Sequence, residues 1–153
     1  MAAANANRDA QRQPGELIPY TGASGYLYYK GTLLIKEGAA TTRVIPLTAA
    51  GSSMGTFLGV VENRVDLSAG LGTSQEIINV WTKGEFTFVA NGTGASSDIG
   101  KMAYGLDDQT VGNSMAVHSV PVGLITGIPT SSTYRVLIDN AVGMRGVSLL
   151  QNL

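Results

Sequence analysis

Hydrophobic and polar residues alternate over short runs along most of this chain, which is the pattern of half-buried β-strands. The clearest run is GEFTFVANG (84–92), in which Phe86 and Phe88 share one face and Glu85 and Thr87 share the other. A strand with this alternation places its apolar face on the core and its polar face in solvent. The pattern therefore predicts β-structure here.

Further strands are predicted wherever runs rich in β-branched and aromatic residues lie between turn residues. A glycine inside the first run (Gly31) indicates a bulge, and Pro46, which has no N–H to donate, predicts an edge strand. The segment TGASSDIG (93–100) predicts one helical turn, capped by Ser or Asp and stopped by Gly100. The predicted strands are 26–38, 43–47, 56–62, 76–84, 84–92, 101–105, 114–119, 120–128 and 132–139. Strands of this length and spacing predict a mainly β fold, a compact small barrel or a sandwich with at most one short helical turn.

One pattern occurs twice in the chain. LGVV (58–61) precedes EIINVWTKG (76–84), and VGLI (122–125) precedes TYRVLIDNA (133–141). Each pair is typical of a hairpin with a glycine in its first strand. The glycines then mark bulges or places where two backbones approach closely.

Composition divides the chain into three segments. Residues 1–24 are polar, contain Pro and Gly and lack periodicity, so we expect an extended N-terminal arm with Leu17, Ile18 and Tyr20 as its anchors. The alternative is an ordinary loose chain end. Residues 25–139 are expected to form the β domain, and residues 140–153 a C-terminal extension.

The composition also excludes several classes of protein. Charged residues make up 14% and apolar residues 44% of the 153 residues, which suits one folded domain and not a disordered chain. No run approaches the ~18 apolar residues of a membrane span, and the first residues lack the apolar stretch of a secretory signal. The absence of cysteine excludes disulfides and thiolate chemistry. A net charge of −1 with scattered signs predicts no nucleic-acid partner.

Candidate catalytic groups occur, but in the wrong context. Ser53 lies in a G-x-S-x-G sequence, and Asp107 or Asp108 and then His118 follow in the order of a hydrolase triad. That motif requires a helix after the serine, and a predicted strand follows instead. The adjacent aspartates suit a turn, not the alternating ligands of a calcium loop. We therefore predict no enzyme, no catalytic residue, no metal site and no cofactor.

Aromatic residues favour a core or a protein-contact role. Tyr26 and Tyr28 share one face of the first predicted strand, and Trp81 suits either a core or an interface anchor. Tyrosines also stack bases in single-strand binders, but those proteins interleave them with more basic residues than this chain has.

Several segments follow one another in a particular order: Asn7-Arg8-Asp9 with Gly15-Glu16-Leu17, LGVVENRVDLSAG (58–70), VWTKGEFTFVANGT (80–93), DIGKMAYGLDDQTV (98–111), and PVGLITGI with YRVLID (121–139). Together they resemble the head decoration (cement) proteins of tailed bacteriophages, in particular those of Mu-like transposable phages. The set covers most of residues 5–139, and residues 140–153 look like an extension past the usual end of that family.

The resemblance implies a homotrimer that binds the outer face of the assembled head, with the major capsid protein as its partner and no nucleic acid or membrane. It implies a small β-barrel or β-tulip whose arms lie across neighbouring capsomers. The expected location is the outer face of the virion capsid, after synthesis in the host cytoplasm. A phage tail or baseplate β-module and a small β-barrel binding protein remain as alternatives. The candidate capsid or trimer contacts are Asn7, Arg8, Asp9, Leu17, Ile18, Tyr20, Tyr26, Tyr28 and Trp81.

Overall fold

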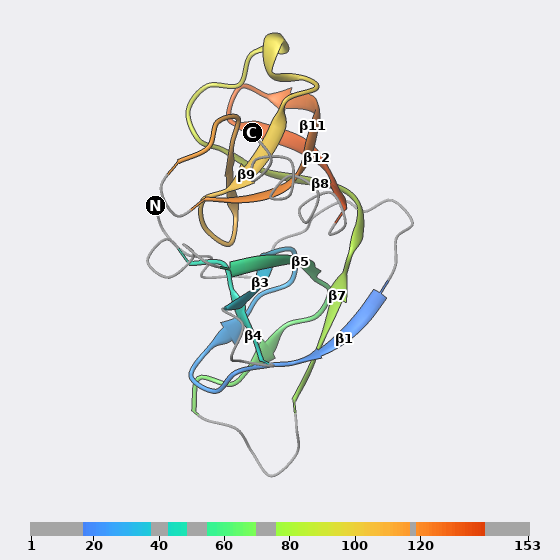
Figure 1. Ribbon diagram of the computed structural model, residues 1–153, viewed down its shortest axis with the longest axis vertical. Helices are drawn as coiled ribbons and strands as arrows, with labels where there is room; N and C mark the ends of the chain where they lie inside the picture. The colour runs from blue at the N-terminus through green and yellow to red at the C-terminus, as the bar shows by residue number, and fades with distance from the viewer. Residues whose placement is uncertain (1–16, 38–42, 49–54, 70–75, 117–118, 140–153) are drawn as a thin grey trace, which may run out of the picture.

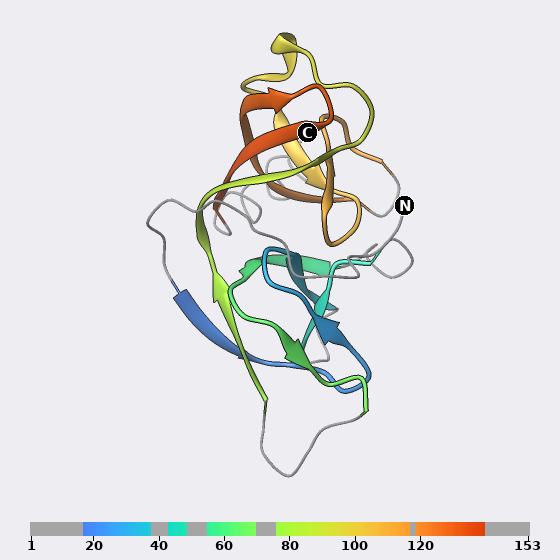
Figure 2. The ribbon, with the colours of Figure 1, turned by 180° about the vertical axis from the view of Figure 1, so that it is seen from behind.

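The computed structural model describes residues 17–37, 43–48, 55–69, 76–116 and 119–139. Over these residues the chain is mainly β, with one short 3-10 turn, as the hydrophobic pattern predicted. The strands form a closed five-stranded barrel and a curved five-stranded sheet, drawn above and below one another in Figures 1 and 2. The barrel alternative of the predicted fold class is therefore confirmed.

The sheet is antiparallel, and its two edges behave differently. One edge strand is β4, which contains Pro46, so the predicted edge strand is confirmed. At an edge, the N–H that proline lacks does not interrupt hydrogen bonding between two inner strands. At the other edge β1 curls back, because Gly22 forms a parallel bridge with Val44 of β4. The spatial order is β1 (Leu17–Thr21), β7 (Ile77–Trp81), β5 (Gly55–Val61), β3 (Leu33–Glu37) and β4 (Val44–Pro46). A separate two-stranded ribbon pairs β2 (Leu27–Tyr28) with β6 (Val65–Asp66).

Side chains along the barrel strands alternate between the inside and the outside of the barrel. In β8, Phe86, Phe88 and Ala90 are buried, as the alternation predicted. The 3-10 turn η2 (Ser96–Asp98) is followed by Gly100 at φ 90°, which confirms the predicted turn and its stop. Its N-cap position is Ala95, so the predicted Ser or Asp cap is absent there, and Asp98 in the turn accepts from the Ala95 N–H instead. The order around the barrel is β10 (Thr110–Gly112), β8 (Lys83–Ala90), β12 (Thr133–Asp139), β11 (Val120–Thr130) and β9 (Met102–Gly105), with β9 paired to β10.

A shared hydrophobic core joins the barrel to the sheet. Leu33 and Ile35 of β3 pack in the same cluster as Phe86 and Phe88 of the barrel. Between them Leu34 points the other way, into a second cluster that includes Tyr28, Leu67, Ile78 and Val80. The sheet is thus a layer with a core on both faces. The strands β7 and β8 are separated only by Thr82, so one stretch of chain passes from the sheet into the barrel, as Figure 1 shows.

The two glycines of the repeated pattern lie where backbones approach closely. A Cβ on Gly59 would overlap the carbonyl oxygen of Trp81, and a Cβ on Gly123 would overlap that of Leu137. The strand register also shifts beside each glycine, between Leu34 and Ile35 on β3 and near Gly123 on β11. Both parts of the prediction, a bulge and a close approach, are confirmed.

Two predicted strands were wrong. The run 26–38 is not one strand with a bulge: it is β2 and β3, separated by a turn in which Gly31 takes φ 83°. This turn sends β2 to the ribbon and β3 to the sheet. In the run 114–119, the described residues Ser114–Ala116 and Ser119 are not in a strand, and a strand instead precedes them at β10. Its parallel pairing with β8 joins residues distant in sequence, which local alternation does not detect.

The predicted arm, residues 1–24, contains a strand of the domain. Leu17–Thr21 forms β1 and pairs with β7, so its backbone groups join a ladder within the same chain. On its inner face Ile18 lies opposite Val80, and Tyr20 packs on the second core cluster. Residues 1–16, and the C-terminal extension 140–153, lie outside the described residues.

Candidate functional site

The candidate site is the exposed face of the paired strands β1 and β7. Cross-strand pairing places Leu17 opposite Trp81 and Thr21 opposite Ile77, and side chains alternate between faces along each strand. Leu17 is 43% exposed and Ile77 is 50% exposed, whereas Trp81 is half-buried against the core shared with the barrel. We call this surface the β1–β7 face; it comprises Leu17, Pro19, Thr21, Ile77, Asn79 and Trp81.

The barrel explains why part of this surface is uncovered. The same side of the sheet is buried under the barrel at β3 and β5, where Ile35 and Phe57 are almost fully buried. At the edge of the sheet, Leu17, which pairs with Trp81, and Ile77, which pairs with Thr21, remain exposed. The strand register places Leu17 and Ile77 at opposite ends of this face, so its exposed apolar area comes from two separate side chains. Apolar area at a protein surface is a candidate for contact with another protein.

A small pocket lies next to Trp81, where the sheet meets the barrel. Its volume is about 150 Å³, and Trp81 and Phe86 line it together with Lys30 and Glu62. Small-molecule sites usually measure roughly 300–1,000 Å³, so this pocket is too small for most cofactors. Its size and the aromatic rings of Trp81 and Phe86 in its lining suit one side chain of a protein partner.

The structure divides the predicted contact residues. Leu17 and Trp81 lie on the β1–β7 face, while Ile18 and Tyr20 point to its other side. The side chain of Tyr26 is half-buried and packs on both core clusters. Asn7, Arg8 and Asp9 lie outside the described residues.

Tyr28 is a correction, because its side chain is fully buried and is not available as a surface contact. Its hydroxyl donates to the carbonyl oxygen of Val44 at 2.7 Å and accepts from the N–H of Ala23 at 2.8 Å. Burial raises the pKa of Tyr28 to about 12. The side chain thus joins the end of β1 to β4 and helps to curl the sheet, and its core role was the correct half of the prediction.

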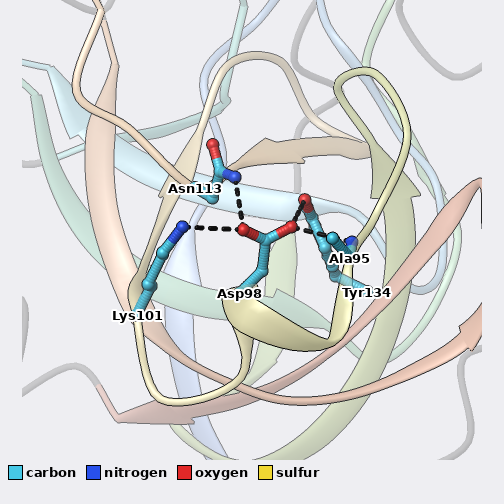
Figure 3. A network of polar contacts seen from close by, with 5 residues as sticks. All are labelled: Ala95, Asp98, Lys101, Asn113 and Tyr134. Atoms are coloured by element: carbon cyan, nitrogen blue, oxygen red, sulfur yellow. Dashed lines mark hydrogen bonds and ion pairs between the residues drawn. The ribbon is translucent and has the colours of Figure 1, made fainter.

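The buried carboxylate of Asp98, which sequence reasoning treated only as a turn cap, is the centre of a polar network. Its Oδ1 accepts from Lys101 Nζ and from Asn113 Nδ2, both at 2.8 Å, and its Oδ2 accepts from the Tyr134 hydroxyl at 2.8 Å and the Ala95 N–H at 2.9 Å (Figure 3). The Lys101 contact, followed by the other donors, holds the pKa of Asp98 well below its usual range. Burial, with the Asp98 carboxylate, raises the pKa of Tyr134 to about 12.

This network holds together the tip of the barrel. It joins η2 to β12 through Tyr134 and to the segment after β10 through Asn113. A carboxylate held ionised by four donors is a stable acceptor and a poor proton donor. The Ala95 contact was within reach of sequence reasoning, because Asp is a common cap, but the Tyr134 contact spans 36 positions and was not.

The adjacent aspartates form a turn between β9 and β10, as predicted. Asp107 Oδ1 accepts from the N–H groups of Gln109 (3.0 Å) and Thr110 (2.7 Å), which is a side-chain-stabilised turn. The carbonyl oxygen of Asp108 accepts from the N–H of Leu33 at 2.8 Å, so the turn also binds the barrel to β3. The buried Asp107 Oδ2 has no hydrogen-bond partner.

The sequence offered few other candidates for catalysis or metal binding. Ser53 and His118 lie outside the described residues. Within the part of the chain that the structure describes, no three metal-ligating side chains gather at one place. None of the helical segments in that part has the length and apolar character to cross a bilayer.

Comparison with protein-family models found no match, and comparison with curated proteins found none either.

Proposed function

We propose that this protein is a head decoration (cement) protein of a tailed bacteriophage. In this proposal it binds the outer surface of the expanded head as a homotrimer and stabilises the lattice of the major capsid protein. The support from the sequence is the ordered set of segments that resemble such proteins between residues 5 and 139. The support from the structure is a β-domain with an uncovered apolar surface.

The β1–β7 face is the observation that carries the proposal. Leu17 and Ile77 are exposed at the edge of the sheet, and β1 begins directly after residue 16. Residues 1–16 precede β1 in the chain, and in this proposal they form an arm that binds the same neighbouring surface as the β1–β7 face. Two contacts that act together strengthen each other through effective concentration.

The mechanism would be linkage between binding and lattice stability. A closed trimer presents three identical faces, which match three capsid subunits around a local three-fold position. Each contact need bury only ~1,000 Å² for tight attachment of the whole trimer. A protein that binds the expanded lattice and not the free subunits stabilises that lattice against heat and internal pressure.

The decisive experiment measures binding of purified protein to undecorated heads. We expect Leu17→Glu and Ile77→Glu each to weaken decoration at least tenfold, because a carboxylate would be desolvated in the contact. The matched control is Val89→Glu on β8 of the barrel, a residue that is 40% exposed and lies outside the β1–β7 face. Occupancy is read from sedimented heads or by electron microscopy.

Saturation of heads by both variants at wild-type concentrations would overturn the assignment of the contact to the β1–β7 face, and no binding of the wild-type protein to any head would overturn the proposed function. Deletion of the arm belongs to the same test and must end at residue 16, because removal of residue 17 onward would destroy β1. The mass of the pure protein is the further measurement: a trimer is expected, and a ring or stack would instead favour the tail or baseplate alternative.

A further inference from the structure

A second exposed apolar surface lies on the outside of the barrel, away from the β1–β7 face. Leu124 of β11 pairs directly with Leu137 of β12 on one side and with Met102 of β9 on the other. Leu124 is 39% exposed, Leu137 is 45% exposed and Met102 is half-buried. We call these three residues the barrel row. Directly paired side chains have Cβ atoms roughly 4.5–5.5 Å apart, so the row is one continuous apolar strip.

The surroundings of the barrel row define what can cover it. Next to Leu137 on β8 stands Glu85, whose carboxylate forms an ion pair with Arg135 at 3.2 Å. The strip is therefore bounded by charge on that side. Because the barrel is closed, it offers no free strand edge, and an incoming segment must lie across the strands on its side chains.

The chain itself supplies a suitable segment at a suitable place. The last strand, β12, ends at Asp139, two residues after Leu137. Fourteen residues follow, of which seven are apolar (Ala141, Val142, Met144, Val147, Leu149, Leu150 and Leu153) and only Arg145 is charged. Such a composition is unusual for a solvated tail, which is normally polar and charged.

Length and linkage also fit this occupant. At ~3.3 Å per residue, fourteen extended residues reach ~46 Å, whereas three neighbouring strands span only ~10 Å. Gly143 and Gly146 permit the reversal that a return across the barrel requires. Attachment two residues from the row gives the segment a high effective concentration there.

We propose that residues 140–153 fold back across the barrel row of their own chain and cover Met102, Leu124 and Leu137. There the segment stabilises the outside of the barrel, at a surface separate from the β1–β7 face that is proposed to bind the capsid. This inference does not depend on the proposed function, because it concerns contacts within one chain.

Hydrogen exchange followed by mass spectrometry tests it on the full-length protein. We expect amides within residues 142–150 to exchange at least tenfold more slowly than in the synthetic peptide 140–153. The double variant Leu124→Thr, Leu137→Thr should return them to the peptide rate, while threonine preserves the strands. The matched control, Val89→Thr, replaces an exposed apolar residue outside the row and should leave protection unchanged.

Three results would overturn the inference. One is exchange of 142–150 at the peptide rate in the wild-type chain. Another is protection that persists in the double variant, which would place the segment elsewhere. The last is protection that disappears on dilution while the domain stays folded, which would assign the segment to a neighbouring copy. Head binding is not measured here, so failure would leave the proposed function untouched.

Discussion

Replacement of Tyr28 by Phe removes one hydroxyl group from the buried junction between the end of β1 and β4. The ring keeps its packing among Leu34, Ile78 and Val80, so the substitution isolates the hydrogen bonds. The hydroxyl now donates to the Val44 carbonyl at 2.7 Å and accepts from the Ala23 N–H at 2.8 Å. Both backbone groups lose a partner in the variant.

The expected cost is moderate, because the two groups are also bonded to each other. The Ala23 N–H donates directly to the Val44 carbonyl at 3.3 Å, and this contact remains after the substitution. A net hydrogen bond contributes about 0.5–1.5 kcal/mol and an unsatisfied buried group costs about 1–3 kcal/mol, so with partial compensation we expect a loss of about 1–2 kcal/mol. For a chain of this size that lowers the Tm by about 2–8 °C.

Equilibrium unfolding in urea measures the effect as a shift of the midpoint at constant slope. The matched control is Tyr104→Phe, at a half-buried tyrosine on the outer side of β9, which should change stability by less than about 0.5 kcal/mol. A loss below about 0.3 kcal/mol for Tyr28→Phe would refute the role of the hydroxyl. At a temperature where the variant stays folded, its binding to heads should equal that of the wild-type protein, because Tyr28 is not on the surface.

The same residue makes a pH-dependent prediction with a definite sign. Burial raises the pKa of Tyr28 to about 12, above its ordinary value of about 10 in the unfolded chain. The unfolded state therefore releases the proton first, and wild-type stability should fall as the pH rises from about 10 to about 12. In Tyr28→Phe this loss should be smaller, and the remainder should come from Tyr134, whose pKa is also raised to about 12.

Two further substitutions test the barrel. Asp98→Asn removes the charge that Lys101 and Tyr134 stabilise, so the variant should be less stable than the wild-type protein at pH 7. Because the pKa of Asp98 is lowered on folding, wild-type stability should fall as the pH drops below about 4. The variant should lose this acid dependence in urea titrations between pH 2 and 7. An unchanged acid slope would contradict the network. Gly123→Ala places a Cβ against the Leu137 carbonyl and should lower the free energy of unfolding by more than about 2 kcal/mol. In the control Gly127→Ala the Cβ meets only the Arg135 side chain at ordinary distance, so the decrease should be less than about 1 kcal/mol. Equal decreases in thermal unfolding would refute the close-approach argument.

Sequence reasoning was most accurate where the deciding contacts are local or backbone-imposed. The alternation in β8 predicted which side chains are buried, because strand side chains point to opposite faces by geometry alone. Pro46 predicted an edge because it lacks a donor wherever it lies. Gly59 and Gly123 predicted close approach, since a side chain there would collide with a neighbouring strand.

It was least accurate where one segment has two physically reasonable fates. Leu17, Ile18 and Tyr20 were expected to anchor an arm on a partner, and they instead form β1 on β7 of the same chain. Five residues that are mostly apolar, LIPYT (17–21), suit either role. The choice depends on whether a matching strand edge is free in the folded domain, and β7 provides one.

The candidate site was found only in part for the same reason. Leu17 and Trp81 were named from residue type, and the structure places them opposite each other on adjacent strands. Ile77 was missed as a surface residue, because a β-branched residue in an apolar run is normally buried. Its exposure depends on where the barrel stops covering the sheet, which no local pattern records.

The amino-acid sequence by itself determined the mainly β class, most of the described strand positions, the short turn at Ser96–Asp98, the positions that require glycine and the edge position of the strand that contains Pro46. Those features depend on side-chain alternation and backbone sterics, which act over a few residues. The tertiary structure alone decided the closure of the barrel through the parallel β8–β10 pair, the burial of Tyr28 and the meeting of Asp98 with Tyr134. Each of these joins residues far apart in the chain, and its free energy exists only after the intervening strands have packed.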